Sequence, residues 1–424
     1  MLNGDQPPEG GGMKTWVHEW DDSVAPRPGD GPRDTRPVEV DDETLRDGIQ
    51  CPSAKNPPLQ AKLEFLHLLV RLGVQAVDIG LPASGPHQSE DALYLAKEIA
   101  RGELPIEANC AARTVAADIR AVVRISQRAG IPVGVATFIG SSAVRQYAEG
   151  WDMAFLLKST RESVTSAVKE GLPVTFVTED TTRAHPQILR DLYSAAIDCG
   201  ARRLCIADTV GYATPAAAKN LVSFIKGVME ESGAEVKLDW HGHMDRGLGL
   251  ITALAALEAG ADRLHGCALG LGERVGNTPL DLLLVNLKLM GRWPGDLSAL
   301  TDYVEWVTRW TGVPIPWNYP VFGRDAYRTG TGIHAAAILK ALQKGDEAMA
   351  DVVYSAVPPS WFGKHQIIEV GPMSGESNVV FWLRAHDLEP TQERILAVMH
   401  LAKESNHTLS NDEIFGVLAR LEKT

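Results

Sequence analysis

Cysteine is scarce in this sequence, and its spacing disfavours structural roles. The 424 residues contain five cysteines, an odd number with no Cys-X-X-Cys pair, at positions 51, 110, 199, 205 and 267. An odd count excludes a fully paired disulfide framework, and the spacing disfavours a structural zinc knuckle. We therefore expect a protein of the reducing cytoplasm.

Long apolar runs and an excess of basic residues are also missing. No uninterrupted apolar stretch reaches the roughly 18 to 20 residues that cross a bilayer, and the polar N-terminus has no signal-peptide core. Lys and Arg number 41 against 54 Asp and Glu, which gives a formal net charge of −13. This surplus of acid argues against nucleic acid or a membrane as the partner, although a locally positive site could still bind an anionic small molecule.

Residues 1–36 read as an N-terminal tail that we expect to be partly disordered. The segment contains Pro7-Pro8, a run of three glycines and little apolar periodicity, so it cannot bury enough surface to offset the entropy of ordering. The patch 15–20 is the exception, because its two tryptophans could dock on another part of the chain.

Residues 37–290 alternate short β-rich runs with longer helical stretches. Apolar residues three and four positions apart, such as Leu63, Leu66 and Leu69, mark the helical stretches, and glycines follow their ends. Eight such runs predict an α/β fold, a (β/α)8 TIM barrel, with a doubly wound sheet as the alternative. The runs lie at 38–40, 76–79, 106–108, 133–138, 174–177, 203–206, 236–240 and 263–267.

The alternation stops at about residue 290. Pro314, Pro316 and Pro320 mark a linker-like stretch, and helical patterns follow near 334–348, 391–404 and 411–422. We expect residues 291–424 to form a smaller, mainly helical C-terminal subdomain.

The strongest chemical signal is His241-Gly242-His243, at the end of the seventh run. Side chains alternate along a strand, so the two imidazoles point the same way and are placed to bind a divalent metal. The alternative is that both histidines only line the mouth of a barrel.

A second signal follows the first run, in the segment 43–50. In a barrel this loop shares a face with the end of the seventh strand, where Asp47 could complete a two-histidine, one-carboxylate metal site. Arg46 could stabilise a developing oxyanion. Taken alone, the segment reads as a capping aspartate before a glycine turn, with Arg46 in a surface ion pair.

Polar residues follow most of the other strands and would converge on the same mouth. Each of them alone is typical of a helix N-cap or a turn, so their weight is collective. Glycines after the eighth run leave room for a ligand to approach the backbone. The polar residues are Asp78, Glu179, Asp180, Asp208, Thr209, Glu273 and Asn277.

Seven motifs occur in an order that resembles one enzyme superfamily. They are DETLRDGIQCPS, VDIGLPASGP, TFIGSS, VTEDTTR, ADTVGYATP, the long segment from HGHMDRGLGL to GERVGNTPL, and GTGIH. Together they resemble the metal-dependent barrel superfamily of 2-isopropylmalate synthase, homocitrate synthase, citramalate synthase and 3-hydroxy-3-methylglutaryl-CoA lyase. The resemblance spans roughly 40–290 and continues more loosely to the C-terminus.

The resemblance implies an acyltransferase of amino-acid biosynthesis that performs a Claisen condensation. An acyl-CoA, commonly acetyl-CoA, would be the co-substrate of a 2-oxo acid, and the cofactor would be a divalent metal: Mg²⁺, Mn²⁺ or Zn²⁺. A homodimer is also implied, with the C-terminal subdomain as a lid and dimerisation element. We expect no counterpart here of the long feedback-regulatory domain of many 2-isopropylmalate synthases.

The resemblance also implies roles for individual residues. Arg46 would stabilise the enolate or the oxygen of the 2-oxo substrate, and Glu179 would lie close to the reacting groups. The metal ligands would be Asp47, His241 and His243, with Asn277 at or near the ion. The residues that contact substrate would be Gln50, Asp78, Thr209, Gly272 and Glu273.

The catalytic base would come from the C-terminal subdomain. In the synthases a Ser-Gly-Ile-His-like motif supplies a histidine to the neighbouring subunit's site, and the corresponding segment here is Thr331-Gly332-Ile333-His334. His334, aided by Glu179, would remove a proton from the acyl-CoA, because the ordinary pKa of histidine suits general-base work. A tyrosine that follows in the synthases resembles Tyr354. The alternative for His334 is a structural histidine at a helix start.

Two other functions stay open. A lyase or aldolase would cleave a hydroxyacyl compound at the same metal, and Ile49 resembles the lyase sequence, whereas the Glu273-Arg274 loop resembles the synthases. A non-catalytic metal-binding barrel is suggested by Ile49, Asp78 and Thr329, where the synthases usually have Glu, Glu and His. Retention of the metal-ligand set argues against that third reading.

Overall fold

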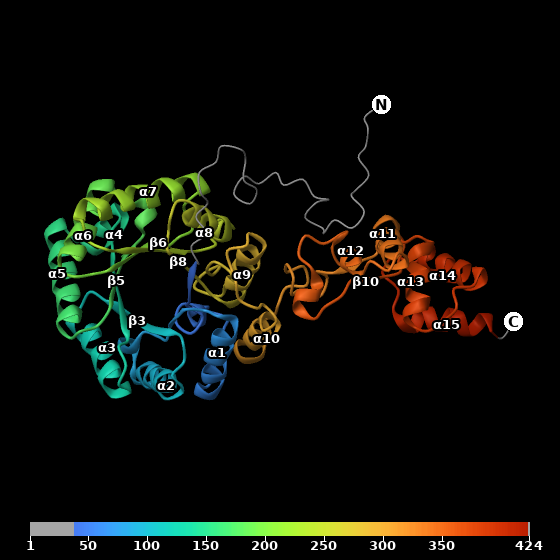
Figure 1. Cartoon of the computed structure of the whole chain (residues 1–424), viewed down its shortest axis with the longest axis horizontal. Helices are drawn as coiled ribbons and strands as arrows, with labels where there is room; N and C mark the ends of the chain where they lie inside the picture. The colour runs from blue at the N-terminus through green and yellow to red at the C-terminus, as the bar shows by residue number, and fades with distance from the viewer. Residues whose placement is uncertain (1–37, 423–424) are drawn as a thin grey trace, which may run out of the picture. The chain divides into compact units, whose positions relative to one another are not determined.

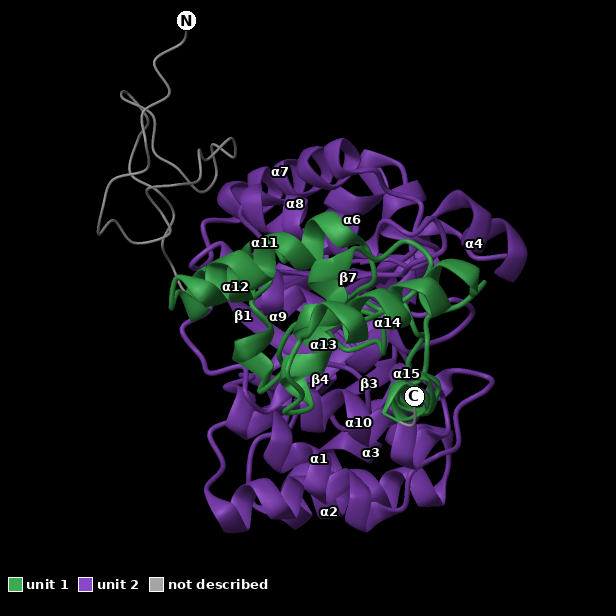
Figure 2. Cartoon of the chain, turned by 90° about the vertical axis from the view of Figure 1, so that its right-hand side faces the viewer, with its two compact units in different colours: residues 1–33, 315–424 green, residues 34–314 purple. Residues whose placement is uncertain are grey.

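The chain divides into two compact units. The computed structural model describes residues 38–422, and the boundary between the units falls between Pro314 and Ile315 (Figure 2). The tail predicted for residues 1–36 lies outside the described residues. Of the helices within 38–422, none is both long and apolar enough to cross a membrane.

The first unit along the chain, purple and labelled unit 2 in Figure 2, is a closed barrel of eight parallel strands, which confirms the predicted (β/α)8 fold (Figure 1). Each strand pairs with the next one in sequence, and β8 pairs with β1 from Glu39–Arg263 to Asp42–Gly266, which closes the sheet. All eight predicted runs form strands. They are β1 (Glu39–Asp42), β2 (Ala76–Asp78), β3 (Glu107–Arg113), β4 (Gly134–Gly140), β5 (Val174–Glu179), β6 (Arg203–Asp208), β7 (Lys237–Gly242) and β8 (Arg263–Gly266).

Helices connect the strands and surround the barrel (Figure 1). In α1 the buried side chains include Phe65, Leu66 and Leu69, at the predicted helical spacing. Gly73 ends this helix with a φ of 78°, a left-handed conformation that glycine adopts without strain. The helices are α1 (Leu59–Leu72), α2 (Pro86–Gly102), α3 (Ala116–Ala129), α4 (Ala143–Glu149), α5 (Met153–Lys169), α6 (Pro186–Asp198), α7 (Pro215–Ser232), α8 (Gly249–Glu258), α9 (Leu280–Leu289) and α10 (Leu300–Thr311), with 3-10 turns at Gly48–Gln50, Pro82–Ser84, Thr181–Arg183 and Ala268–Gly270.

The barrel unit extends past the boundary at residue 290 that the sequence pattern suggests. Helix α10, expected in the C-terminal subdomain, packs instead against α1. The ring of Phe65 stacks on Tyr303 with centroids 5.2 Å apart and lies 4.3 Å from Trp306, whose Nε1 donates to the Ala61 carbonyl at 3.0 Å. The strand–helix alternation ends before α10, so periodicity alone does not assign this helix to the barrel.

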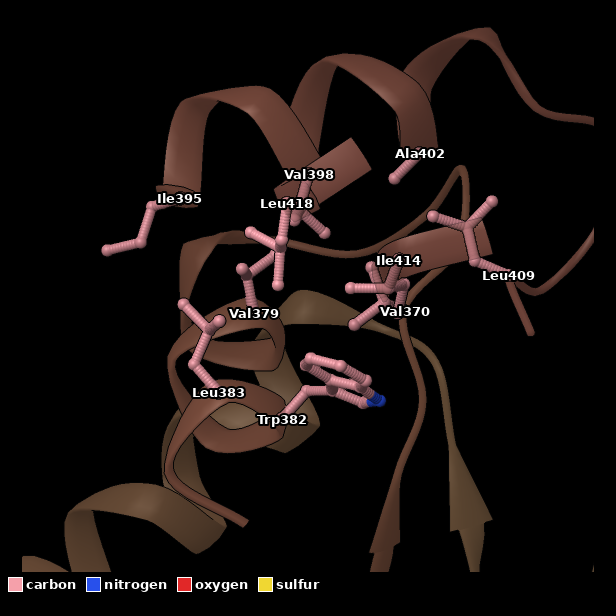
Figure 3. Close-up of a cluster of buried hydrophobic side chains, with 10 residues drawn as sticks. All are labelled: Val370, Val379, Trp382, Leu383, Ile395, Val398, Ala402, Leu409, Ile414 and Leu418. Carbon is pink, nitrogen blue, oxygen red and sulfur yellow. The ribbon is translucent and has the colours of Figure 1, made fainter. Parts of the chain in front are cut away.

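The second unit along the chain, green and labelled unit 1 in Figure 2, begins at Ile315, is mainly helical and has a hydrophobic core of its own. Figure 3 shows side chains of three helices that point toward one another around Trp382, whose Nε1 donates to Asn411 Oδ1 at 2.9 Å. The elements are β9 (Arg328–Thr329), which pairs with β10 (Ile367–Ile368), α11 (Gly332–Gln343), α12 (Glu347–Val352), α13 (Glu376–Ala385), α14 (Gln392–Glu404) and α15 (Asn411–Leu421), with a 3-10 helix at Pro359–Phe362.

The contact between α10 and α1 predicts the effect of Trp306→Ala. Trp306 is 4% exposed, so removing its indole leaves a cavity, and we expect the free energy of unfolding to fall by about 3–5 kcal/mol in chemical denaturation. Arg309→Ala, at an exposed position of the same helix, is the control and should change it by less than about 0.5 kcal/mol. Equal effects of the two substitutions would contradict the assignment of α10 to the barrel core.

Candidate active site and metal centre

A cavity of about 270 Å³ lies at the C-terminal ends of the barrel strands. Parallel strands bring to this end residues that are far apart in sequence. Asp78 lies behind the lining against Arg46, and Gly272 lies against Asn277. The predicted site residues that line the cavity are Arg46, Asp47, Gln50, Glu179, Thr209, His241, His243 and Glu273.

Three of the predicted metal ligands converge. His241 Nε2 lies 3.2 Å from His243 Nε2, and Asp47 Oδ2 lies 3.4 Å and 3.6 Å from these two nitrogens. All three residues are buried. Ligand atoms bound at about 2.1 Å to one tetrahedral ion lie about 3.4 Å apart, so this spacing fits a divalent metal. Burial and the neighbouring His241 lower the pKa of His243 to about 4, which keeps its ring neutral for coordination.

Asn277 adds a further oxygen beside this group. Its backbone bridges to that of His243, its Nδ2 donates to the Leu271 carbonyl at 2.9 Å, and its buried Oδ1 has no partner within residues 38–422. Gly276 has a φ of 94°, and a Cβ there would lie 1.8 Å from the Gly270 carbonyl oxygen. Only glycine therefore permits the turn that presents Asn277, and the unsatisfied oxygen fits a metal ligand.

Glu43 orients one of the predicted metal ligands. Its carboxylate accepts from His241 Nδ1 at 2.9 Å, which leaves Nε2 of that ring facing Asp47. A second hydrogen bond of this kind fixes the orientation and tautomer of metal-binding histidines. Although burial alone would raise the pKa of Glu43, Arg46 and His241 hold it well below its ordinary value.

A second acidic and histidine-rich group contains Glu43, His241 and His265. His265 Nδ1 lies 2.7 Å from Glu43 and its Nε2 lies 3.2 Å from Asp239, so both ring nitrogens face carboxylates. Burial disfavours the charged ring, but these hydrogen bonds raise the pKa of His265 to about 10. A protonated imidazole cannot bind a metal, so the set of Asp47, His241 and His243 is the better centre.

Arg46 is held by three carboxylates. Its Nε donates to Asp78 at 2.8 Å, and its other nitrogens contact Glu43 at 2.5 Å and Asp47 at 3.2 Å. Burial raises the pKa of Asp78 to about 7, against the opposing influence of the guanidinium. This triple contact fixes the guanidinium at the cavity wall beside the metal ligands, where it can stabilise an oxyanion.

The remaining predicted residues of the barrel lie around the cavity mouth. Glu179 pairs with Arg145 at 3.2 Å, and burial raises the pKa of its carboxyl group. The Thr209 hydroxyl accepts from a backbone N–H at 2.8 Å. Gln50 and Glu273 are exposed. These four residues can offer hydrogen bonds or a carboxylate to a molecule in the cavity.

His334 and Tyr354 lie in the second unit and contact each other. Their rings stack with centroids 3.9 Å apart, and His334 Nδ1 lies 3.4 Å from the Thr329 hydroxyl. His334 is the third residue of helix α11 and lies in its first turn. The structure thus brings this predicted pair together within the second unit.

Several residues of the cavity were not assigned a role from the sequence. Their shared signal is the strand period of two, which places them on the same inner face as the predicted residues. That signal alone cannot separate them from other inward-facing polar residues. They are Asp41, Glu43, Asn109, Asp239 and His265.

Known proteins resemble this chain in sequence and in fold. The sequence matches the HMGL-like family over residues 38–307. It is 33% identical over 369 residues to homocitrate synthase AksA of Methanopyrus kandleri, which covers 86% of this chain and 87% of that protein. It is 28% identical over 394 residues to a 2-isopropylmalate synthase of Sediminispirochaeta smaragdinae, which covers 90% of this chain and 75% of that protein.

A solved structure shares the barrel fold. The HMG-CoA lyase of Bacillus subtilis superimposes with a TM-score of 0.55 at 20% identity, over 66% of this chain and 95% of the lyase. Nearly the whole lyase is therefore matched by about two thirds of this chain.

The convergence of Asp47, His241 and His243 predicts a divalent-metal site. In His241→Ala we expect Mn²⁺ affinity, measured by calorimetry, to fall by at least about 100-fold, because one ligand is lost. His87→Ala, whose side chain is 64% exposed, should bind Mn²⁺ like the unmodified protein. Circular dichroism checks that both variants are folded. Undiminished Mn²⁺ binding by folded His241→Ala would contradict the site.

Proposed function

Because the chain belongs to the HMGL-like family, we propose that it is an acyltransferase that condenses an acyl-CoA with a 2-oxo acid in a divalent-metal-dependent Claisen reaction. The observation that carries the proposal is the span of the synthase match. It covers 369 residues, and residues 1–314 can account for at most 314 of them, so the match includes part of the second unit. The match to the lyase structure covers 66% of this chain, a length close to that of the barrel unit alone.

The metal would be held by Asp47, His241 and His243, with Asn277 beside them. When bound there, a divalent cation supplies a Lewis acid that favours negative charge on the ketone oxygen of the 2-oxo acid. Gln50, Thr209, Gly272 and Glu273 would contact the substrates at the cavity mouth. Acetyl-CoA is the acyl donor that we propose.

Arg46 contributes a fixed positive charge to the same oxygen. The guanidinium is oriented by Asp78 and Glu43 before substrate arrives, so it need not reorganise as negative charge develops. Asp78 thus acts on the substrate through Arg46.

His334 is the base that we propose for carbon–carbon bond formation. It takes a proton from the carbon next to the thioester carbonyl, and that carbon attacks the keto carbon of the 2-oxo acid. The ketone oxygen becomes an alkoxide and is protonated. Water then cleaves the thioester to give CoA thiol and a 2-hydroxy-2-carboxyalkanoate. Tyr354 would fix the His334 ring by stacking, and Glu179 would assist the proton transfer.

The reaction predicts release of free thiol that depends on a 2-oxo acid. With Mg²⁺ or Mn²⁺ and acetyl-CoA, a panel of 2-oxo acids should include at least one that releases CoA thiol. In Arg46→Lys we expect kcat to fall by about 10²- to 10³-fold, because a single ammonium cannot replace the fork that contacts three carboxylates.

Arg113→Lys is the matched control for this substitution. Arg113 is 61% exposed at the side chain and pairs with Asp118 outside the cavity, so its replacement should leave kcat unchanged. If no 2-oxo acid releases thiol but a hydroxyacyl-CoA is cleaved, the protein is a lyase. If neither reaction occurs, it is a non-catalytic metal-binding barrel.

If the protein is a homodimer in which the partner subunit's His334 completes the site of each barrel, two inactive variants should restore activity when they are combined. Asp47→Asn and His334→Ala should each be inactive alone. Co-expressed, they form mixed dimers in which one site combines an intact barrel with an intact second unit, so we expect thiol release to return. Coexpression of Asp47→Asn with His241→Ala is the control and should stay inactive, because both changes damage the barrel. Full activity of His334→Ala alone would remove this residue from the mechanism.

A further inference from the structure

The inside of the barrel has two unlike walls. On one side, β1, β7 and β8 carry charged groups that include Asp41 and His265. On the other side, β4 and β5 face the cavity with Ala136, Phe138 and Val177. Barrel interiors are usually filled by bulky branched side chains, so an alanine in this wall leaves space for the side chain of a substrate.

The cations along this space are already bound. Among the described residues that line the cavity, the arginines are Arg46 and Arg274, and no lysine is present. Arg46 contacts three carboxylates, whereas Arg274 donates to both oxygens of Asp245 at 2.9 Å and 3.0 Å. The second carboxylate of a dicarboxylic 2-oxo acid would therefore lose water without gaining a cation, which is unfavourable.

Asp41 carries an unsatisfied oxygen in the same space. It lies on β1 two residues before Glu43, is 3% exposed and lines the cavity. Its Oδ2 accepts from Asn109 Nδ2 at 2.8 Å, but its buried Oδ1 has no partner in the described part of the chain. A buried carboxylate oxygen that lacks a donor is destabilising, so the site is suited to a ligand that brings one.

We propose that the 2-oxo acid carries a hydrogen-bond donor at the end of its side chain and no second carboxylate, and that Asp41 Oδ1 accepts from this donor. The proposal rests on the proposed function and specifies its substrate class: 2-oxo acids that end in a hydroxyl or amino group. Asp41 thereby determines specificity, whereas the metal ligands and Arg46 hold the reacting end.

The distance between the two ends suits a short side chain. Two residues along a strand span about 6–7 Å, so Asp41 lies about that much deeper than Glu43, next to which the metal ligand His241 is held. A chain of two or three atoms that leaves the keto carbon toward the barrel interior, across from the wall formed by Ala136 and Val177, would bring its end to Asp41.

Like charge at the deep end argues further against a dicarboxylate. Asp239 lies on the neighbouring wall, with its Oδ2 3.2 Å from His265 Nε2, and the same nitrogen lies 4.0 Å from Asp41 Oδ2. The positive charge of His265 is therefore shared by Glu43, Asp239 and Asp41. Arg203 pairs with Asp239 at 2.6 Å, so it too is already bound, and a fourth carboxylate here would have to share cations that other carboxylates hold.

Three acids of the form X–CH2–CH2–CO–COO⁻ test the proposal. They are 4-hydroxy-2-oxobutanoate, 2-oxopentanoate and 2-oxoglutarate, in which X is hydroxyl, methyl and carboxylate. We expect kcat/KM to fall in that order, by about tenfold from hydroxyl to methyl and by at least about 100-fold from hydroxyl to carboxylate. The assay is thiol release from acetyl-CoA with Mn²⁺ present.

Asp41→Asn removes the charge while it retains the shape of the side chain. The discrimination against 2-oxoglutarate should shrink by at least about tenfold, because the repulsion is gone. Asp42→Asn is the matched control. Asp42 accepts from the Tyr303 hydroxyl at 2.5 Å and does not line the cavity, so the ratios among the three acids should not change.

The outcomes separate this proposal from the proposed function. Preference of the unmodified protein for 2-oxoglutarate would overturn the proposal, since Asp41 would then act as a protonated donor to a carboxylate. Equal or better use of 2-oxopentanoate than of the hydroxy acid would also overturn it. If no 2-oxo acid releases thiol, the proposed function fails. Calorimetric binding of the three acids to the Mn²⁺-loaded protein then supports the proposal if affinity follows the same order, and overturns it if it does not.

Discussion

The candidate site depends on one buried carboxylate, that of Glu43. Its oxygens contact His241 Nδ1 at 2.9 Å, His265 Nδ1 at 2.7 Å and the guanidinium of Arg46. These partners come from β7, β8 and the loop after β1. A buried charge is tolerated only while its partners stay in place, so each of the four groups requires the others. His241 and Arg46 are therefore both positioned by the carboxylate of Glu43. A shift of either residue is opposed by the contact that Glu43 makes with the other.

Residues at different depths along a strand of this barrel are suited to different roles. Side chains two positions apart share a wall and differ in depth by about 6–7 Å. On β7 and just beyond it, Asp239 lies deepest, His241 follows, and His243 lies at the mouth. Groups that hold the reacting end of a substrate therefore occupy the upper positions, and groups that meet the far end of its side chain occupy the lower ones. A change at Asp41 or Asp239 can alter the choice of substrate while the metal ligands above it remain unchanged.

The fold and the convergence of Asp47, His241 and His243 could be predicted because their signals are local. The eight strands each carry their own apolar pattern, and two histidines two positions apart must share a face. The partners of Glu43 could not be predicted, because His265 lies 222 residues away and only barrel closure brings it near. For the same reason α10 could not be assigned to the barrel, because its apolar face packs against Phe65 of α1, which is distant in sequence. Such long-range contacts have no counterpart in a local pattern.

The departures from the usual synthase residues fall beside groups with chemical roles and retain contacts with them. Asp78 is one methylene shorter than the usual Glu, yet its carboxylate accepts from Arg46 Nε at 2.8 Å. Thr329 replaces the usual His, and its hydroxyl lies 3.4 Å from His334 Nδ1. A barrel that only bound metal would need neither of these contacts. Their retention beside an unchanged metal-ligand set therefore favours an enzyme whose substrate has changed over a binding protein that has lost its chemistry.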